Sequence, residues 1–87
     1  MTKAEWIAAA HARFVRWASH KRVHGTQGTF EALRGHVATR LDEPADLRWW
    51  GAVCVSLRDA GVISKTARFA PAKSSNDAAK AVWVVRG

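Results

Sequence analysis

The fold is decided by the stretch WWGAVCVSLRDAGVI, which runs from Trp49 to Ile63. Trp50, Val53 and Leu57 recur at intervals of three and four residues, and that spacing is typical of the buried face of a helix. Gly61 follows, and glycine commonly ends a helix because it adopts the left-handed conformation without strain. The apolar residues after it favour a strand. The stretch therefore predicts a helix, a glycine cap and a strand in direct succession.

The same kind of spacing upstream predicts three helices in all. The third is expected over about Ala45 to Ala60, with Pro44 in its first turn, where the missing amide costs nothing. The second is expected over about Phe30 to Arg40, with Thr29 as its cap, and the first over about Lys3 to Lys21. The buried face of the third helix is expected to comprise Leu47, Trp50, Val53, Cys54, Leu57 and Ala60.

Local signals mark the ends of the first helix. Thr2 and Glu5 match a capping box, in which both side chains bond free amides at a helix start. Gly25 and Gly28 supply turn geometry after the helix. Four of the tryptophans fall on expected core faces: Trp6, Trp17, Trp50 and Trp83. Trp49 lies at the border of the third helix's buried face, where it either closes the edge of the core or stacks on a partner.

The C-terminal part predicts a hairpin. Strands are expected over Val62 to Ala70 and over Ala81 to Arg86, because both are rich in β-branched and aromatic residues. Between them, Pro71 to Lys80 is expected to form a polar loop. The 87 residues are enough for one domain with one small core. The sequence therefore predicts a single α+β domain of three helices followed by a C-terminal β-hairpin.

This order of elements is that of a winged helix-turn-helix domain. The pattern Trp49-Trp50-Gly51, then Ala60-Gly61-Val62-Ile63 and a closing Val82-Trp83, resembles small phage and prophage winged-helix proteins. The resemblance covers residues 29–87. It implies a first helix in 1–23, a helix-turn-helix in 29–61 and a wing hairpin in 62–87. It also implies a phage regulatory or replication-accessory protein, such as a transcription regulator, that binds DNA with its third helix in the major groove.

The charge pattern indicates a polyanionic partner. Fourteen Lys and Arg against seven Asp and Glu give a net charge of +7. The excess lies in residues 11–24 and 64–87, whereas residues 25–63 are nearly neutral. We therefore expect a non-enzymatic protein that contacts double-stranded DNA mainly through phosphates.

The candidate DNA contacts come from three segments. An arginine can bind guanine or phosphate, a serine can donate to phosphate, and an apolar side chain can touch a thymine methyl group. The third helix offers Arg48, Trp49, Val55, Ser56 and Arg58. The hairpin offers Lys65, Arg68, Lys73, Ser74 and Lys80. The first helix and the turn after it offer Arg13, Arg16 and Arg22. Two structural alternatives stay open: a solvated face on the first helix, and hairpin lysines that discourage aggregation.

An alternative function belongs to another class. The outer face of the third helix around Trp49, Ala52 and Val55 is largely apolar, which is typical of a protein contact. The chain could therefore be a protein-interaction module that engages a host or phage protein through this helix. A homodimer formed through the first helix is compatible with either function.

Other chemistries are disfavoured. No catalytic set of residues is present, so an enzyme is not expected. His20 and His24 stand four residues apart but have no third ligand nearby, so neither a metal nor another cofactor is expected. Gly25-Thr26-Gln27-Gly28 matches the G-x-x-G loop of KH domains, but no strand is evident before the first helix. Cys54 is alone, and no stretch has the length of a membrane span. A cytoplasmic location, in the host cell interior or nucleoid, is expected.

Overall fold

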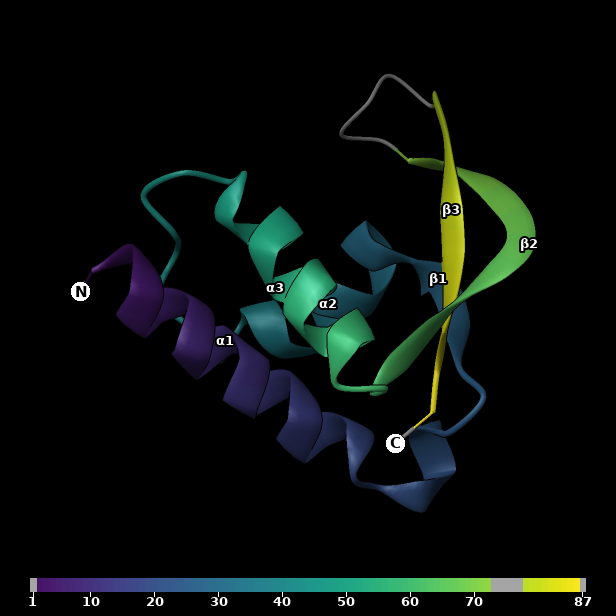
Figure 1. Ribbon diagram of the computed structural model, residues 1–87, viewed down its shortest axis with the longest axis horizontal. Helices are drawn as coiled ribbons and strands as arrows, with labels where there is room; N and C mark the ends of the chain where they lie inside the picture. The colour runs from purple at the N-terminus through teal and green to yellow at the C-terminus, as the bar shows by residue number, and fades with distance from the viewer. Residues whose placement is uncertain (1, 73–77, 87) are drawn as a thin grey trace.

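Three α-helices and a three-stranded antiparallel sheet form the fold. The computed structural model describes residues 2–72 and 78–86 (Figure 1). In chain order the elements are α1 (Lys3–Ala18), the 3-10 turn η1 (Lys21–Val23), β1 (Gln27–Thr29), α2 (Phe30–Ala38), α3 (Trp49–Asp59), β2 (Ile63–Ala72) and β3 (Ala78–Val85). The helices lie on one side of the sheet. The prediction of a small α+β fold is confirmed, and the arrangement is compatible with a winged-helix-like architecture.

The start of α1 is as predicted, and its end is not. The Thr2 amide donates to Glu5 Oε1 over 2.9 Å, and the Glu5 amide donates to Thr2 Oγ1 over 3.2 Å, so the capping box is confirmed. The helix ends at Ala18 rather than Lys21. Its last turn is closed by the Ser19 hydroxyl, which donates to the Arg16 carbonyl. The chain then becomes extended at His20 and continues as η1.

The third helix is shorter than predicted. It begins at Trp49 because Asp46 Oδ1 accepts the Arg48 amide over 2.9 Å and holds the preceding residues in a turn. Pro44 therefore lies outside the helix. Leu47 is 62% exposed and does not belong to the buried face. Ala60, the C-cap, is also exposed, and Gly61 follows with the left-handed φ of 77° that was expected.

The sheet contains a strand that the sequence pattern did not predict. β1 pairs antiparallel with β3, and the strand order is β1-β3-β2, so β3 is central. Thr29 belongs to both β1 and the start of α2: its backbone pairs with Val82, and its side chain accepts the Ala32 amide as the predicted cap. One buried residue therefore joins the sheet to α2.

The hairpin of β2 and β3 is longer and more irregular than predicted. Ladder pairs continue to Ala72↔Ala78, so the polar loop expected over residues 71–80 is wrong at both ends. The register shifts between Lys65, which is paired with Trp83, and Phe69, which is paired with Ala81. Such a bulge bends a strand and increases its twist. Within it, the Thr66 hydroxyl donates to the Val82 carbonyl over 2.8 Å.

The core lies between the three helices and the covered face of the sheet. Trp6 and Trp50 are buried and meet edge to face at 4.9 Å between ring centroids. Their expected core positions are confirmed, whereas Trp17 and Trp83 are only partly buried. The largest fully buried side chains are Phe14, Leu33, Leu57, Ile63, Val37, Val53 and Val85. This packing holds α1 against α2 and α3. On one side, α1 and α2 leave a cleft between them that is open to solvent.

Candidate functional site

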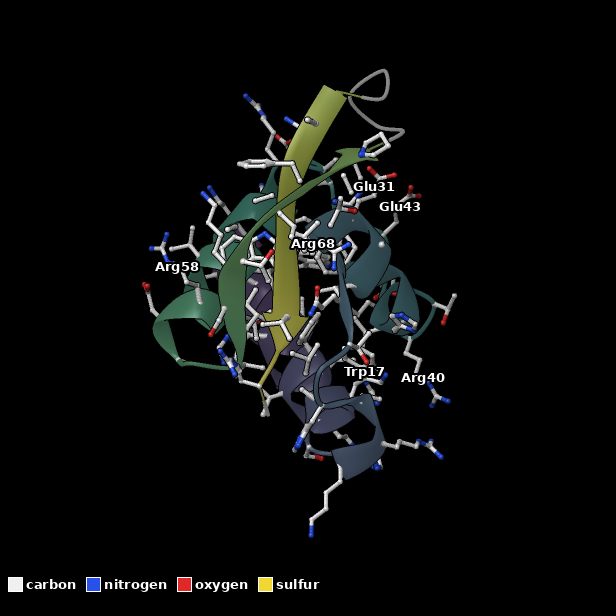
Figure 2. All side chains as sticks on the ribbon, turned by 90° about the vertical axis from the view of Figure 1, so that its right-hand side faces the viewer. Trp17, Glu31, Arg40, Glu43, Arg58 and Arg68 are labelled. Atoms are coloured by element: carbon white, nitrogen blue, oxygen red, sulfur yellow. The ribbon has the colours of Figure 1, made fainter. Side chains whose placement is uncertain are left out.

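A cationic cleft lies between the C-terminal halves of α1 and α2, with η1 at one end. Its volume is about 330 Å³. Its lining comprises Arg13, Arg16, Trp17, His20, Arg22, His36, Val37 and Arg40, and we call it the arginine cleft. None of the described residues that line it is acidic. Figure 2 shows Trp17 and Arg40 on the same side of the molecule, as this lining requires.

Helical spacing and the short connection after α1 bring these residues together. Arg13 and Arg16 are three residues apart on α1, so their side chains share a face. The end of α1 at Ala18 and the turn into η1 bring Arg22 to the same cleft. On the other wall, His36 in α2 and Arg40 just beyond it are four residues apart. The Arg40 amide donates to the Val37 carbonyl over 3.0 Å, which continues the helical turn as far as Arg40.

The guanidinium groups of the cleft have no acidic partner among residues 2–72 and 78–86. The ion pairs in this part of the chain join Arg48 to Asp46 and Arg58 to Asp59. Within these described residues, none of the cleft arginines forms an ion pair: Arg13, Arg16, Arg22 and Arg40. A concave surface lined by charges of one sign concentrates its field. A cleft with this lining therefore attracts anions.

Two aromatic rings form one wall of the arginine cleft. The rings of Trp17 and His36 are stacked, with 4.8 Å between centroids and an interplanar angle of 12°. Trp17 also meets Phe14 edge to face at 5.2 Å, which ties the stack to the core. His36 is exposed. Trp17 thus lies at the boundary between core and cleft rather than wholly in the core.

The two arginines predicted as contacts from the third helix are ion-paired. Arg48 Nη2 lies 2.8 Å from Asp46 Oδ2, and Arg58 Nη2 lies 3.1 Å from Asp59 Oδ1. Hydrogen bonds from the Arg48 side chain and amide lower the pKa of Asp46 to about 2, so its carboxylate is charged at neutral pH. Figure 2 places Arg58 on the opposite side of the molecule from Trp17 and Arg40. Neither arginine lines the arginine cleft, and each is paired with a carboxylate.

The other predicted contacts on α3 differ in accessibility. The Ser56 hydroxyl donates to the Val53 carbonyl and is hydrogen-bonded to His11 on α1, each over 2.8 Å, so it is already occupied. Trp49 is partly buried and lies 6.0 Å from the Trp6 ring, which favours its role at the core edge. Val55 is 46% exposed.

The hairpin contributes exposed cations away from the arginine cleft. Lys65, Arg68 and Lys80 are exposed, as predicted for phosphate contacts. Arg68 lies on the open side of the sheet (Figure 2), where its Nη1 makes a long hydrogen bond of 3.5 Å to Gln27. Lys80 lines a separate groove between the starts of α2 and α3, where both Arg34 and Glu31 are found. The predicted contacts Lys73 and Ser74 lie outside the described residues.

The structure brings Arg13, Arg16 and Arg22 together, and it adds residues that the sequence pattern did not single out. His36, Arg40 and Trp17 were not among the predicted contacts. The spacing of His36 and Arg40, four apart on a predicted helix, placed them on one face. The spacing did not show which face of α1 would lie opposite His36 and Arg40.

Comparison with protein-family models, with curated proteins and with solved structures found no match for this chain. Over the part of the chain that the structure describes, no group of three or more His, Cys, Asp or Glu side chains is placed to hold a metal ion. None of the helices in that part combines the length and apolarity needed to cross a membrane.

Proposed function

We propose that this chain is a non-enzymatic, winged-helix-type protein that binds duplex DNA through its phosphates. The observation that carries the proposal is the arginine cleft, where four guanidinium groups converge without an acidic neighbour among the described residues. Arginine suits this role because its planar fork of donors matches the oxygens of a phosphate. Each phosphate that such a group neutralises releases condensed counterions, and that release favours binding.

The fold supports the winged-helix part of the proposal. β1 lies between the first two helices, and the β2–β3 hairpin follows α3 directly. The hairpin would correspond to the wing, with Lys65, Arg68 and Lys80 as exposed cations. In this interpretation the hairpin adds phosphate contacts to those of the cleft.

The proposed binding depends weakly on base sequence. On α3, Arg48 and Arg58 are each held by a carboxylate, and Ser56 is bonded to α1. A helix that reads bases needs free donors and acceptors at the groove. Contacts to phosphates, by contrast, carry no sequence information directly. We therefore expect similar affinities for duplexes of different sequence.

A salt titration with charge-matched variants tests the proposal. Wild type is expected to bind a short labelled duplex with an affinity that falls linearly with salt on a log–log plot, and each phosphate that the protein neutralises steepens the slope by about 0.9. Arg16→Ala should make the slope shallower by about that amount, because one phosphate is no longer neutralised. Arg58→Ala removes the same charge from an ion pair on the opposite side, and it should leave the slope nearly unchanged. Circular dichroism checks that both variants fold.

Two outcomes would overturn the proposal. Wild type could fail to bind the duplex even at low ionic strength, in which case DNA is not the partner. Alternatively, Arg16→Ala and Arg58→Ala could lower the affinity and the slope equally. Binding would then follow the net charge of the protein, and the cleft would have no special role.

The alternative, a protein-interaction module, is favoured by one observation. Val55 on α3 is 46% exposed, although it is apolar and lies one helical turn before the ion pair of Arg58 and Asp59. Val55→Glu separates the two functions. If the variant loses capture of a protein partner from host lysate but keeps duplex affinity, α3 is a protein contact. If duplex affinity falls as it does in Arg16→Ala, α3 belongs to the DNA interface.

A further inference from the structure

The arginine cleft contains a feature that phosphate binding alone does not use. The imidazole ring of His36 is stacked on Trp17 at 4.8 Å and is nearly parallel to it. Trp17 covers one face of this ring, and His36 is exposed, so the part of the ring that a ligand could contact is its opposite face and its edge. Among the described residues no other ring contacts His36. The stack therefore ends in a flat surface that is held in place by Trp17 and, behind it, by Phe14.

Cationic groups surround this flat surface. Arg40 follows His36 by four residues and therefore lies over the same face of the helical turn. Arg13 and Arg16 approach from α1 on the other wall. The cleft thus offers guanidinium groups and an open ring face within about 330 Å³, at the lower end of the usual 300–1,000 Å³ range for ligand pockets.

This combination distinguishes between classes of anion. An acidic peptide could pair with the arginines but would have no use for the ring. A nucleotide uses both, because its phosphate accepts from guanidinium groups while its base stacks on an aromatic face. Inside a duplex, neighbouring base pairs cover the faces of each base. Only an unpaired base can therefore reach His36.

We propose that the arginine cleft binds a single-stranded segment of nucleic acid, with one base stacked on His36 and the adjoining phosphates on Arg13, Arg16 and Arg40. The inference rests on the proposed function and names the form of nucleic acid that this cleft accepts best. Duplex DNA would use the arginines alone, whereas a single strand uses the arginines and the ring.

The test compares a pyrimidine single strand with an abasic strand of the same length, which keeps the phosphates and lacks the bases. His36→Ala is expected to weaken binding of the base-containing strand roughly 5- to 150-fold, the range for removal of one base–aromatic stack. Binding of the abasic strand and of a duplex should not change. His36→Phe keeps a ring and should retain most of the single-strand affinity. Phe69→Ala is the matched control, because it removes an exposed aromatic ring that does not line the cleft.

The outcomes separate the two proposals. If wild type binds neither strand nor duplex, the proposed function itself fails. If duplex binding depends on Arg16 but His36→Ala and Phe69→Ala have the same effect on the base-containing strand, only the single-strand inference is overturned. The same holds if wild type binds the abasic strand as tightly as the base-containing one. Oligoglutamate serves as the acidic-peptide probe, and tight binding of it would also overturn the inference.

Discussion

Arg48 and Arg16 show how a neighbouring carboxylate changes what an arginine can do. Both are exposed, but Arg48 donates to both oxygens of Asp46, whereas Arg16 has no ion pair among the described residues. A phosphate that approaches Arg48 must displace or tolerate a negative charge. A phosphate that approaches Arg16 can pair with its guanidinium group without competing with a carboxylate. At the scale of single residues, the cations that make up the net charge of +7 therefore differ in how readily they can bind a phosphate.

Cys54 gives a prediction at this scale. Burial raises the pKa of its thiol to about 11, although the positive charge of Arg58 acts in the opposite direction. Since the thiolate is the reactive form, alkylation by iodoacetamide at neutral pH should be roughly a hundredfold or more slower than for a free cysteine. The rate should increase as pH rises toward 11. Denaturant provides the control, because the same thiol should then react at the ordinary rate; equal rates with and without denaturant would contradict the prediction.

At the scale of elements, the sequence predicted the helix caps, which involve neighbouring residues. It did not predict the pairing of β1 with β3, which lies far away in the chain. The capping box of Thr2 and Glu5 and the glycine cap at Gly61 involve neighbours in sequence, so pattern alone identified them. β1 has three residues and no apolar alternation. It becomes a strand only because β3 lies alongside it, and no local pattern reports such a partner. The start of α3 was misplaced for a different, local reason: the turn in which Asp46 accepts the Arg48 amide competes with the helix.

Thr29 supplies a prediction for the junction of β1 and α2. Thr29→Ala removes the oxygen that accepts the Ala32 amide, so the free energy of unfolding should fall by about 1 kcal/mol, within the usual range of 0.5–2 for removal of a cap. Thr29→Ser keeps the oxygen and should retain most of that stability. Urea denaturation measures both. A Thr29→Ser variant as unstable as Thr29→Ala would show that the buried methyl group matters more than the cap.

At the scale of the whole molecule, the sequence predicted which segments are basic but not how they meet. Arg13, Arg16 and Arg22 were predicted as contacts from the first helix and the turn after it. Their convergence with His36 and Arg40 depends on how α1 crosses α2. The buried side chains of Phe14, Leu33 and Val37 set that crossing, and no one-dimensional pattern gives its angle. The cationic segments were thus predictable, whereas the cleft was not.

The described residues that line the cleft include no Asp or Glu, and this also affects the rate at which a complex would form. A concave surface of one charge sign attracts an oppositely charged partner before contact and orients it on approach. The association rate constant of wild type for a labelled strand should therefore fall steeply with added salt, while the dissociation rate changes less. Stopped-flow mixing measures both constants. Arg22→Ala, which removes a cation that η1 contributes to the cleft, should slow association. Arg48→Ala, which removes an ion-paired arginine outside the cleft, should not. If instead salt acted only on dissociation, the cleft would hold its partner without guiding it there. The placement of the acidic residues is thus expected to affect the rate of encounter as well as the strength of binding.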